Sequence, residues 1–365
     1  MSDYMKFAFM CQESKRNASG RVAVIGAGPA GLSATGYLVC EGYTVDIYDK
    51  LPLPGGLMTF AIPPWRIQPE RVLSGTRELE EKFGVKYLLK TKVFSGDPLH
   101  EEGDDFVERN VHLEDLLNSY DLLIVATGTW SSKIPKMPGA DSKGVLSALE
   151  YLYAWRIYEY GFTSKKPHAS KKAIVVGAGF SAVDAAERAQ RSGAEVHVVY
   201  RRTVKEAPAG MYEIERLRRE GITFIELASP LEIIAENDHV SAVKFQKMKL
   251  GPADETGRPR PVPIPGEEFT IEADTVIFAT GETPTPPLAG EISEKLGIKL
   301  NRDGTIAVNN LMQTSVTKLF AAGDVSTGPS KIGPAIRSGL KAARSMHRWF
   351  YAKIGKPITS TKVIS

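Results

Sequence analysis

The stretch RVAVIGAGPAGLSATGYLVCEGYTVDIYD, residues Arg21 to Asp49, decides the fold because a second copy follows later in the chain. It aligns without a gap with KAIVVGAGFSAVDAAERAQRSGAEVHVVY, residues Lys172 to Tyr200. Each copy has a β-branched run, a glycine-rich turn, a helical pattern and a second β-branched run. The repeat therefore predicts an α/β fold with two Rossmann-like dinucleotide-binding units. Such a pair holds two nucleotides, or one nucleotide beside a decayed site.

The glycines of both copies have the spacing of a phosphate-binding turn. The first permits the tight turn, the second lets the backbone approach a pyrophosphate, and the third lets the helix pack close to its strand. Because each turn follows a strand and opens a helix, we predict a nucleotide site in each copy rather than a chance loop. The expected contacts are Gly26, Gly28, Pro29, Ala30 and Gly31 in the first copy, and Gly177, Gly179, Phe180, Ser181 and Ala182 in the second.

The two copies differ at the end of the second strand. The first copy ends at Asp49, followed by Lys50, and an aspartate there accepts hydrogen bonds from a ribose diol. The second copy ends at Tyr200, followed by Arg201 and Arg202. A carboxylate would repel a 2′-phosphate, whereas guanidinium groups clamp it. We expect NADP rather than NAD at the second site, carried by both arginines; the alternative is a solvated basic turn.

Composition excludes several classes of protein. A net charge of +3 over 365 residues gives no basic surface for nucleic acid or membrane, and no apolar run is long enough to span a bilayer. The N-terminus lacks the pattern of a secretory signal, so we expect a cytoplasmic protein. The six histidines show no metal-ligand spacing and no catalytic triad is present, so we expect no metal site.

The two cysteines, Cys11 and Cys40, cannot build a four-cysteine iron–sulfur cluster or an adjacent redox dithiol. Cys40 is interpreted as a small helix residue packed in a core. Cys11 is left open as a reactive thiol.

Three further segments complete the candidate first site and connect the units. LLIVATG (122–128) and TVIFATG (275–281) are strands that end in an Ala-Thr-Gly turn, suited to chain crossings between domains. KLFAAGDVSTGPSKIGPAIRSG (318–339) contains a strand, a Gly-Asp pair and a helix start marked by Gly333 and Pro334. These three segments carry a resemblance to a class of flavoproteins, and that resemblance implies cofactor contacts at Ala126, Thr127, Gly128, Thr280, Gly281, Gly323, Asp324, Gly333, Pro334 and Ala335.

With these motifs the chain resembles the two-dinucleotide-domain flavoproteins. The resemblance implies that Asp324 binds the ribityl chain or phosphate of FAD. It also implies that the helix after it points its positive end at the flavin, where it stabilises the anionic reduced form. The cofactors implied are FAD and NADP(H).

Longer motifs narrow the resemblance. LPLPGGLMTFAIPPWRIQPERV (51–72), VVYRRTVKEAPA (198–209) and MKLGPADETGRPRPVPIPGEEFTIEADTVIFATG (248–281) are similar to segments of the small subunit of NADPH-dependent glutamate synthase. They are also similar to the homologous large subunit of NADH-dependent ferredoxin:NADP oxidoreductase. The resemblance, from Arg21 to Phe350, implies cofactor contacts at Gly56, Leu57 and Arg66. It implies hydride transfer from NADPH to FAD with no catalytic acid or base from the protein.

Departures from that family pattern bear on the electron acceptor. Only residues 1–20 precede Arg21, where family members carry an iron–sulfur domain, so we expect a separate partner subunit with iron–sulfur clusters or a flavin. A homo-oligomer is left open. The alternatives are a free-standing NAD(P)H oxidase, a quinone or sulfur-compound reductase, and a redox-sensing module without catalysis.

Other departures lie within the matched segments. Ala61, Gln68 and Ala207 replace a usual Gly, Pro and Met, and Glu282 stands where Gln is frequent. A carboxylate near the flavin would disfavour its anionic reduced form. Trp65 and Trp130 either cover the flavin or nicotinamide or pack in an interior.

The expected domain organisation is nested. An FAD-binding domain comprises residues 20–140 and 284–350, and an NADPH-binding domain of residues 141–283 is inserted in it. Residues 1–20 and 351–365 form tails. The segment Tyr151–Phe162, rich in Tyr and Trp, is expected to be a packing helix or linker.

Overall fold

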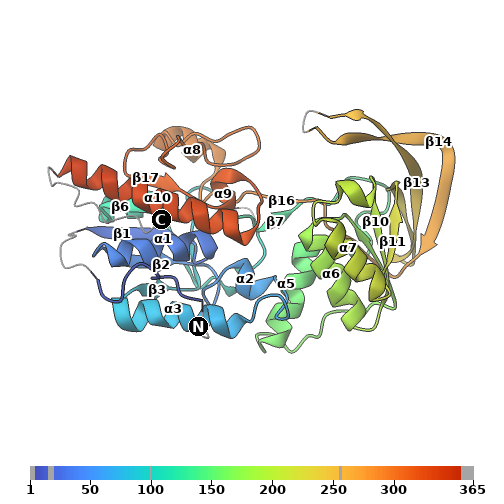
Figure 1. The fold of residues 1–365 in the computed structure, drawn as a ribbon, viewed down its shortest axis with the longest axis horizontal. Coiled ribbons are helices and arrows are strands. Elements are labelled where there is room, and N and C mark those ends of the chain that lie inside the picture. The colour runs from blue at the N-terminus through green and yellow to red at the C-terminus, as the bar shows by residue number, and fades with distance from the viewer. Residues whose placement is uncertain (1–4, 15–19, 99, 255–256, 355–365) are drawn as a thin grey trace. The chain divides into compact units, whose positions relative to one another are not determined.

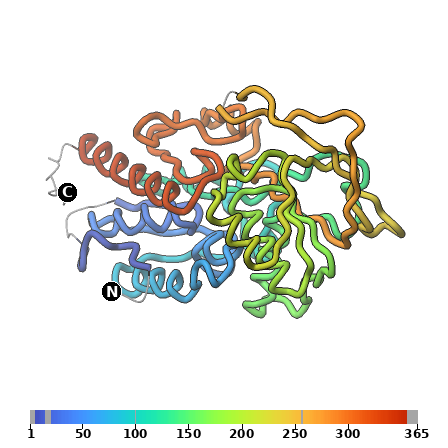
Figure 2. Tube along the Cα trace, turned by 45° about the vertical axis from the view of Figure 1, so that its right-hand side comes forward, coloured from blue at the N-terminus to red at the C-terminus, as the bar shows by residue number. Residues whose placement is uncertain are grey.

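The computed structural model describes residues 5–14, 20–98, 100–254 and 257–354. It divides into two compact units (Figure 1). The first unit comprises Met1–Phe60, Pro64–Ser131 and Thr283–Ser365, and the second comprises Ala61–Pro63 and Ser132–Glu282. Figure 2 shows the early and late parts of the chain, blue and red, side by side within the first unit.

The first unit is built on a five-stranded parallel sheet in the order β17-β6-β1-β2-β3. Four of its strands are short apolar runs that are buried nearly throughout, as expected for parallel strands covered on both faces, whereas the edge strand β3 is exposed or half-buried. Their bounds are β1 Arg21–Ile25, β2 Thr44–Tyr48, β3 Lys86–Leu88, β6 Leu122–Val125 and β17 Leu319–Ala321.

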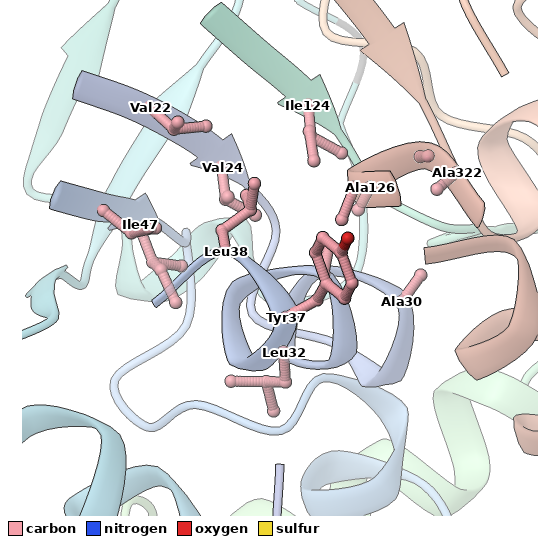
Figure 3. Close-up of a cluster of buried hydrophobic side chains, with 14 of the residues drawn as sticks. Val22, Val24, Ala30, Leu32, Tyr37, Leu38, Ile47, Ile124, Ala126 and Ala322 are labelled. Atoms are coloured by element: carbon pink, nitrogen blue, oxygen red, sulfur yellow. The ribbon is translucent and has the colours of Figure 1, made fainter. Parts of the chain in front are cut away.

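Two helices from opposite ends of the chain pack together in the first unit. Helix α1 (Pro29–Cys40) is buried over almost its whole length and lies against α10 (Ile332–Lys353). Figure 3 shows strand side chains Val22, Ile47 and Ile124 in one cluster with Leu38 and Tyr37 of α1. Because α1 contacts the core on most sides, its sequence shows little amphipathic pattern.

The remaining elements of the first unit are short except for one helix. They are α2 Leu57–Phe60, α3 Pro69–Phe83, β4 Thr91–Val93, a 3₁₀ helix Asp104–Phe106, β5 Arg109–Val111, α4 Leu113–Ser119, α8 Gly290–Leu296 and α9 Asp324–Thr327.

The second unit repeats the plan with a five-stranded parallel sheet in the order β11-β10-β9-β15-β8. The strands are β8 Val145–Ser147, β9 Lys172–Val176, β10 Glu195–Tyr200, β11 Thr223–Glu226 and β15 Thr275–Phe278. Its helices are α5 Ala148–Glu159, α6 Phe180–Arg191, a 3₁₀ helix Val204–Glu206 and α7 Met211–Arg219. The two sheets confirm the predicted α/β class. The buried Tyr151, Tyr153 and Trp155 confirm that α5 is a packing helix.

An antiparallel sheet extends from the second unit. It consists of β12 (Ala228–Glu236), β13 (His239–Ala253) and β14 (Pro259–Glu272), in that order (Figure 1). Phe245, fully buried, belongs to the same apolar cluster as strand residues of the parallel sheet. The turn between β13 and β14 is closed by a hydrogen bond from the Asp254 N–H to the Arg258 carbonyl at 2.7 Å.

Besides the short stretch Ala61–Pro63, the chain passes between the units twice, and these two passages pair with each other. They are β7 (Ser131–Ser132) and β16 (Glu282–Thr283), which form a two-stranded sheet.

A disulfide joins Cys11 to Cys40, with 5.6 Å between their Cα atoms. It holds an N-terminal segment in which Phe7 and Ala8 are buried. A Cβ placed at Gly36 of α1 would lie 2.1 Å from the Phe7 carbonyl oxygen, so only glycine admits the segment there. Cys40 is a buried helix residue as predicted, and Cys11, which the sequence leaves open as a reactive thiol, is bonded to it instead. The two cysteines are 29 positions apart in the sequence, so no local pattern indicates the bond.

Among the described helices, none is long and apolar enough to cross a membrane.

Candidate dinucleotide sites

The first nucleotide turn lies directly on the Ala-Thr-Gly turn that follows β6. Gly26 has φ 107°, and a Cβ placed on it would lie 2.3 Å from the Ala126 carbonyl oxygen. Gly28 caps α1 without a side-chain hydrogen bond, and a Cβ there would meet no atom within 4 Å. The first-turn N–H groups of α1 therefore have clear space in front of them, which fits a pyrophosphate.

Asp49 is fixed beside this turn by the backbone. Its carboxylate accepts the Ala27 N–H at 2.6 Å and the Leu51 N–H at 2.9 Å. Burial raises the pKa of the Asp49 carboxyl above its ordinary value, and the two backbone hydrogen bonds oppose the rise. A carboxylate held in this way still has lone pairs for a ribose diol.

A hollow beside Asp49 is walled by charged residues and Trp130. Lys50 Nζ lies 2.6 Å from a Glu101 carboxylate oxygen and 5.1 Å from the Trp130 ring centroid. Lys92 Nζ lies 2.6 Å from Asp104. Trp130 lines this hollow together with Asp49, and its side chain is only 6% exposed. Trp65 and Arg66 are half-buried in the stretch before α3.

The remaining predicted residues of the first unit lie on three segments. Gly56 contacts the first turn, since a Cβ on it would lie 2.9 Å from the Gly28 Cα, and Leu57 begins α2. The Gly323 N–H donates to Ser338 Oγ at 2.8 Å. Asp324 accepts the Ser330 hydroxyl at 2.7 Å, and burial raises the pKa of its carboxyl.

Helix α10 begins at Ile332, one residue before the predicted start, and has no side-chain cap. Gly333, Pro334 and Ala335 therefore occupy its first turn, where helix N–H groups lack intrahelical partners.

The second nucleotide turn repeats the geometry of the first. Gly177 has φ 136°, and a Cβ on it would lie 2.5 Å from the Ala279 carbonyl oxygen. Gly179 caps α6 without a side-chain hydrogen bond, and a Cβ there would meet no atom within 4 Å. Thr280 donates its hydroxyl to the Lys133 carbonyl at 2.5 Å. The second turn therefore also fits a pyrophosphate.

Glu282 belongs to this second turn. Its carboxylate accepts the Ser181 hydroxyl at 3.2 Å, in the first turn of α6. The structure thus gives the Glu282 carboxylate a partner at the nucleotide turn of the second unit.

Arg201 and Arg202 have different environments, although the sequence treats them as a pair. Arg201 is exposed, whereas Arg202 is 3% exposed. Arg202 donates through Nε to the Pro259 carbonyl at 2.7 Å and through Nη2 to Asp254 at 2.8 Å. The expectation of two equivalent guanidinium clamps therefore requires correction, because the hairpin already engages Arg202.

Within the ranges that the structure describes, no group of three or more His, Cys, Asp or Glu side chains is arranged to hold a metal ion. Asp254, Glu101 and Asp104 are the charged residues near the two sites that the sequence did not reveal. Each meets its lysine or arginine partner only through the fold.

The family model described as "Pyridine nucleotide-disulphide oxidoreductase" matches residues 20–339. The chain is 34% identical over 345 residues to the NADP(+)-dependent formate dehydrogenase subunit beta of Moorella thermoacetica, covering 93% of this chain and 45% of that protein. It is also 34% identical over 340 residues to the glutamate synthase [NADPH] small chain of Escherichia coli strain K12, covering 90% of this chain and 68% of that one. This match confirms the resemblance stated from the sequence. The chain thus spans only part, for the first relative about half, of the proteins it matches.

Among solved structures, Mycobacterium tuberculosis FprA in complex with NADPH has a TM-score of 0.73 at 18% identity. The match covers 93% of this chain and 86% of that one, and it shows a shared fold.

Proposed function

Because the chain belongs to the pyridine nucleotide-disulphide oxidoreductase family, we propose that it is an FAD-dependent NADPH oxidoreductase that passes electrons to a partner subunit. The observation that carries the proposal is the duplicated glycine-rich turn, together with the different charges that follow the second strand of each copy. The first turn has the buried carboxylate of Asp49, and the second has the exposed guanidinium of Arg201. A carboxylate at one strand end and a guanidinium one residue past the other strand end suit two different dinucleotides.

The first unit is the proposed FAD site. The N–H groups of α1 would bind the pyrophosphate, and Asp49 would accept hydrogen bonds from the hydroxyls of the adenosine ribose. Asp324 would bind the ribityl chain. The uncapped start of α10 offers partial positive charge to the flavin. Bound FAD supplies the redox chemistry, since its ring system accepts a hydride and releases electrons to a further acceptor.

The second unit is the proposed NADPH site. The N–H groups of α6 hold the pyrophosphate and Arg201 binds the 2′-phosphate. Hydride donation by NADPH requires no proton transfer, so these residues act by binding and orienting the coenzyme. We also propose a cytoplasmic location, where reduced nicotinamide coenzymes are regenerated.

We assign the electron acceptor to a separate polypeptide that carries iron–sulfur clusters or a flavin. The relatives reported above are a subunit beta and a small chain by name, which supports a partner. Cys11 and Cys40 are bonded to each other, so they do not serve as cluster ligands in this state.

Anaerobic titration of the purified protein tests the assignment. We expect one FAD per chain and loss of the oxidised-flavin absorbance on adding one equivalent of NADPH. Flavin that a chemical reductant bleaches but NADPH does not would refute the NADPH assignment. A chain that cannot be reconstituted with FAD would refute the flavin assignment.

Native co-purification with metal analysis tests the partner. Recovery of a second polypeptide that contains iron or flavin supports it. A lone chain that turns over NADPH with oxygen, a quinone or a sulfur compound as fast as with a dye would contradict it, and would indicate a free-standing reductase.

A further inference from the structure

The two arginines after β10 face different surroundings because successive side chains of an extended segment point in opposite directions. Tyr200 ends the strand and is buried, Arg201 is exposed, and Arg202 is buried. The Leu227 N–H, just after β11, donates a hydrogen bond to the Arg202 carbonyl at 3.2 Å, which fixes the backbone at Arg202. Of the two guanidinium groups, only that of Arg201 is open to solvent.

Arg202 is held by the β13–β14 hairpin from 52 residues further along the chain. Nε donates to the Pro259 carbonyl at 2.7 Å, and Nη2 donates to Asp254 Oδ2 at 2.8 Å. A guanidinium has five N–H donors in a fixed plane, so two contacts with one hairpin fix its orientation.

Asp254 is the more accessible member of this ion pair. Its side chain is 22% exposed, against 4% for Arg202. Its other carboxylate oxygen, Oδ1, accepts the Arg258 N–H at 3.3 Å within the hairpin turn. A phosphate that approaches Arg202 therefore meets the like charge of the Asp254 carboxylate.

We propose that Asp254 is a coenzyme-specificity residue of the second unit, masking Arg202 so that recognition of the 2′-phosphate depends on Arg201. This inference rests on the proposed NADPH site and deepens it. The hairpin supplies an acid at the end of β10, where the strand itself has none. A carboxylate accepts a hydrogen bond from a free 2′-hydroxyl, so Asp254 also offers a partner to the ribose of NADH. The site uses both coenzymes, with a smaller preference for NADPH than two open arginines would give.

The substitution Asp254→Asn tests the proposal in the holoenzyme. Asparagine keeps a carbonyl oxygen for the Arg258 N–H but removes the charge. We expect the ratio of kcat/KM for NADPH to that for NADH to rise about tenfold, the effect of one charged hydrogen bond gained. Asp254→Ala should raise the ratio in the same direction, so the result does not depend on one variant folding well.

Glu267→Gln is the matched control. Glu267 lies on the same hairpin, pairs with Lys247 at 3.2 Å and is half exposed, so the ratio should stay unchanged in this variant. If Asp254 only shapes the hairpin, Asp254→Asn and Asp254→Ala will weaken both coenzymes equally and leave the ratio at its wild-type value. That result would overturn the proposal.

A binding measurement separates this inference from the proposed function. Adenosine 2′,5′-bisphosphate and adenosine 5′-monophosphate differ only by the 2′-phosphate, and calorimetry gives their affinities without any turnover. Asp254→Asn should increase the affinity ratio of these two ligands about tenfold. An unchanged ratio contradicts the role of Asp254 even if NADPH reduces the flavin. A raised ratio supports it even if electron transfer fails.

Discussion

The Asp49 carboxylate accepts the Ala27 N–H through Oδ2 and the Leu51 N–H through Oδ1, so the backbone determines its orientation before any ligand binds. Asparagine at this position cannot satisfy both donors, because its amide nitrogen would face one of the two N–H groups. The residue thus combines two requirements, charge for the ribose and two acceptors for the turn.

We predict that Asp49→Asn weakens FAD binding about ten- to a hundredfold, the range for one or two hydrogen bonds to a charged group. Burial raises the pKa of Asp49, so protonation removes the acceptor at a higher pH than for an ordinary aspartate. FAD affinity should be constant above that pKa and fall as the pH drops through it. Fluorescence of released FAD between about pH 7 and pH 4 measures both effects.

Asp46→Asn is the control, since Asp46 lies on β2, the strand that leads to Asp49, but bonds to Arg21 and Tyr120. It should retain FAD. An Asp49→Asn protein whose FAD affinity depends on pH as in the wild type would contradict the prediction. The pH dependence would then be assigned to Asp324, whose pKa is also raised by burial.

The residues predictable from sequence are those whose role depends on local backbone. The repeat located Gly26 and Gly177, which pack on the carbonyls of Ala126 and Ala279 in the two Ala-Thr-Gly segments. Their cofactor contacts stay predictions. Asp254 was not predictable, because its ion pair with Arg202 requires the path of a whole hairpin. The location of Trp130 was not predictable either, since the sequence gives the size of this side chain and not its neighbours.

At the scale of elements, the N-terminal segment is joined to α1 by the disulfide and packs on it through Phe7. A backbone hydrogen bond from the Met5 N–H to the Arg71 carbonyl at 2.9 Å also joins it to α3. The segment thus connects α3 with α1, the helix that begins at the first nucleotide turn.

We predict that reducing the disulfide, or substituting Cys11→Ser, lowers the free energy of unfolding by about 3–4 kcal/mol. This figure is the loop-closure entropy for a cross-link spanning 29 residues. Urea unfolding with and without dithiothreitol measures it. Dithiothreitol should not change the urea midpoint of the Cys11→Ser protein. A wild-type midpoint that dithiothreitol does not lower would contradict the prediction.

Strand β14 of the hairpin was not predictable from its local sequence. Strand β14 contains four prolines, Pro259, Pro261, Pro263 and Pro265, a composition that usually excludes strands. It is the edge strand of its sheet, and an edge strand tolerates missing N–H donors on its open side. Position in the sheet therefore overrides a local signal that favours a loop.

At the scale of the whole molecule, the repeat was sufficient for the fold class, because two similar strand–turn–helix–strand units predict two parallel sheets. The pairing of β7 with β16 adds a fact that only the structure provides. Both passages between the units lie next to each other, so removal of the second unit leaves ends that a short linker can join.

We predict that replacing residues 133–281 with a flexible linker of about four residues leaves a protein that folds and binds FAD. A chemical reductant should bleach its flavin, but NADPH should not. The complementary chain, residues 132–282, should bind adenosine 2′,5′-bisphosphate. Flavin reduction by NADPH in the shortened protein would contradict the assignment of NADPH to the second unit.

The nested arrangement also imposes an order on synthesis. Strand β17 and helix α10, which complete the first unit, are translated after the whole of the second unit. At ribosomal rates of 5–20 residues per second, β6 waits for its β17 neighbour for roughly 8–30 s or more while residues Ser132–Glu282 emerge. During that time the apolar surface of α1 that α10 will cover is open to chaperones and to other nascent chains. The inner unit can therefore finish folding on the ribosome while the outer one still lacks its last strand and helix.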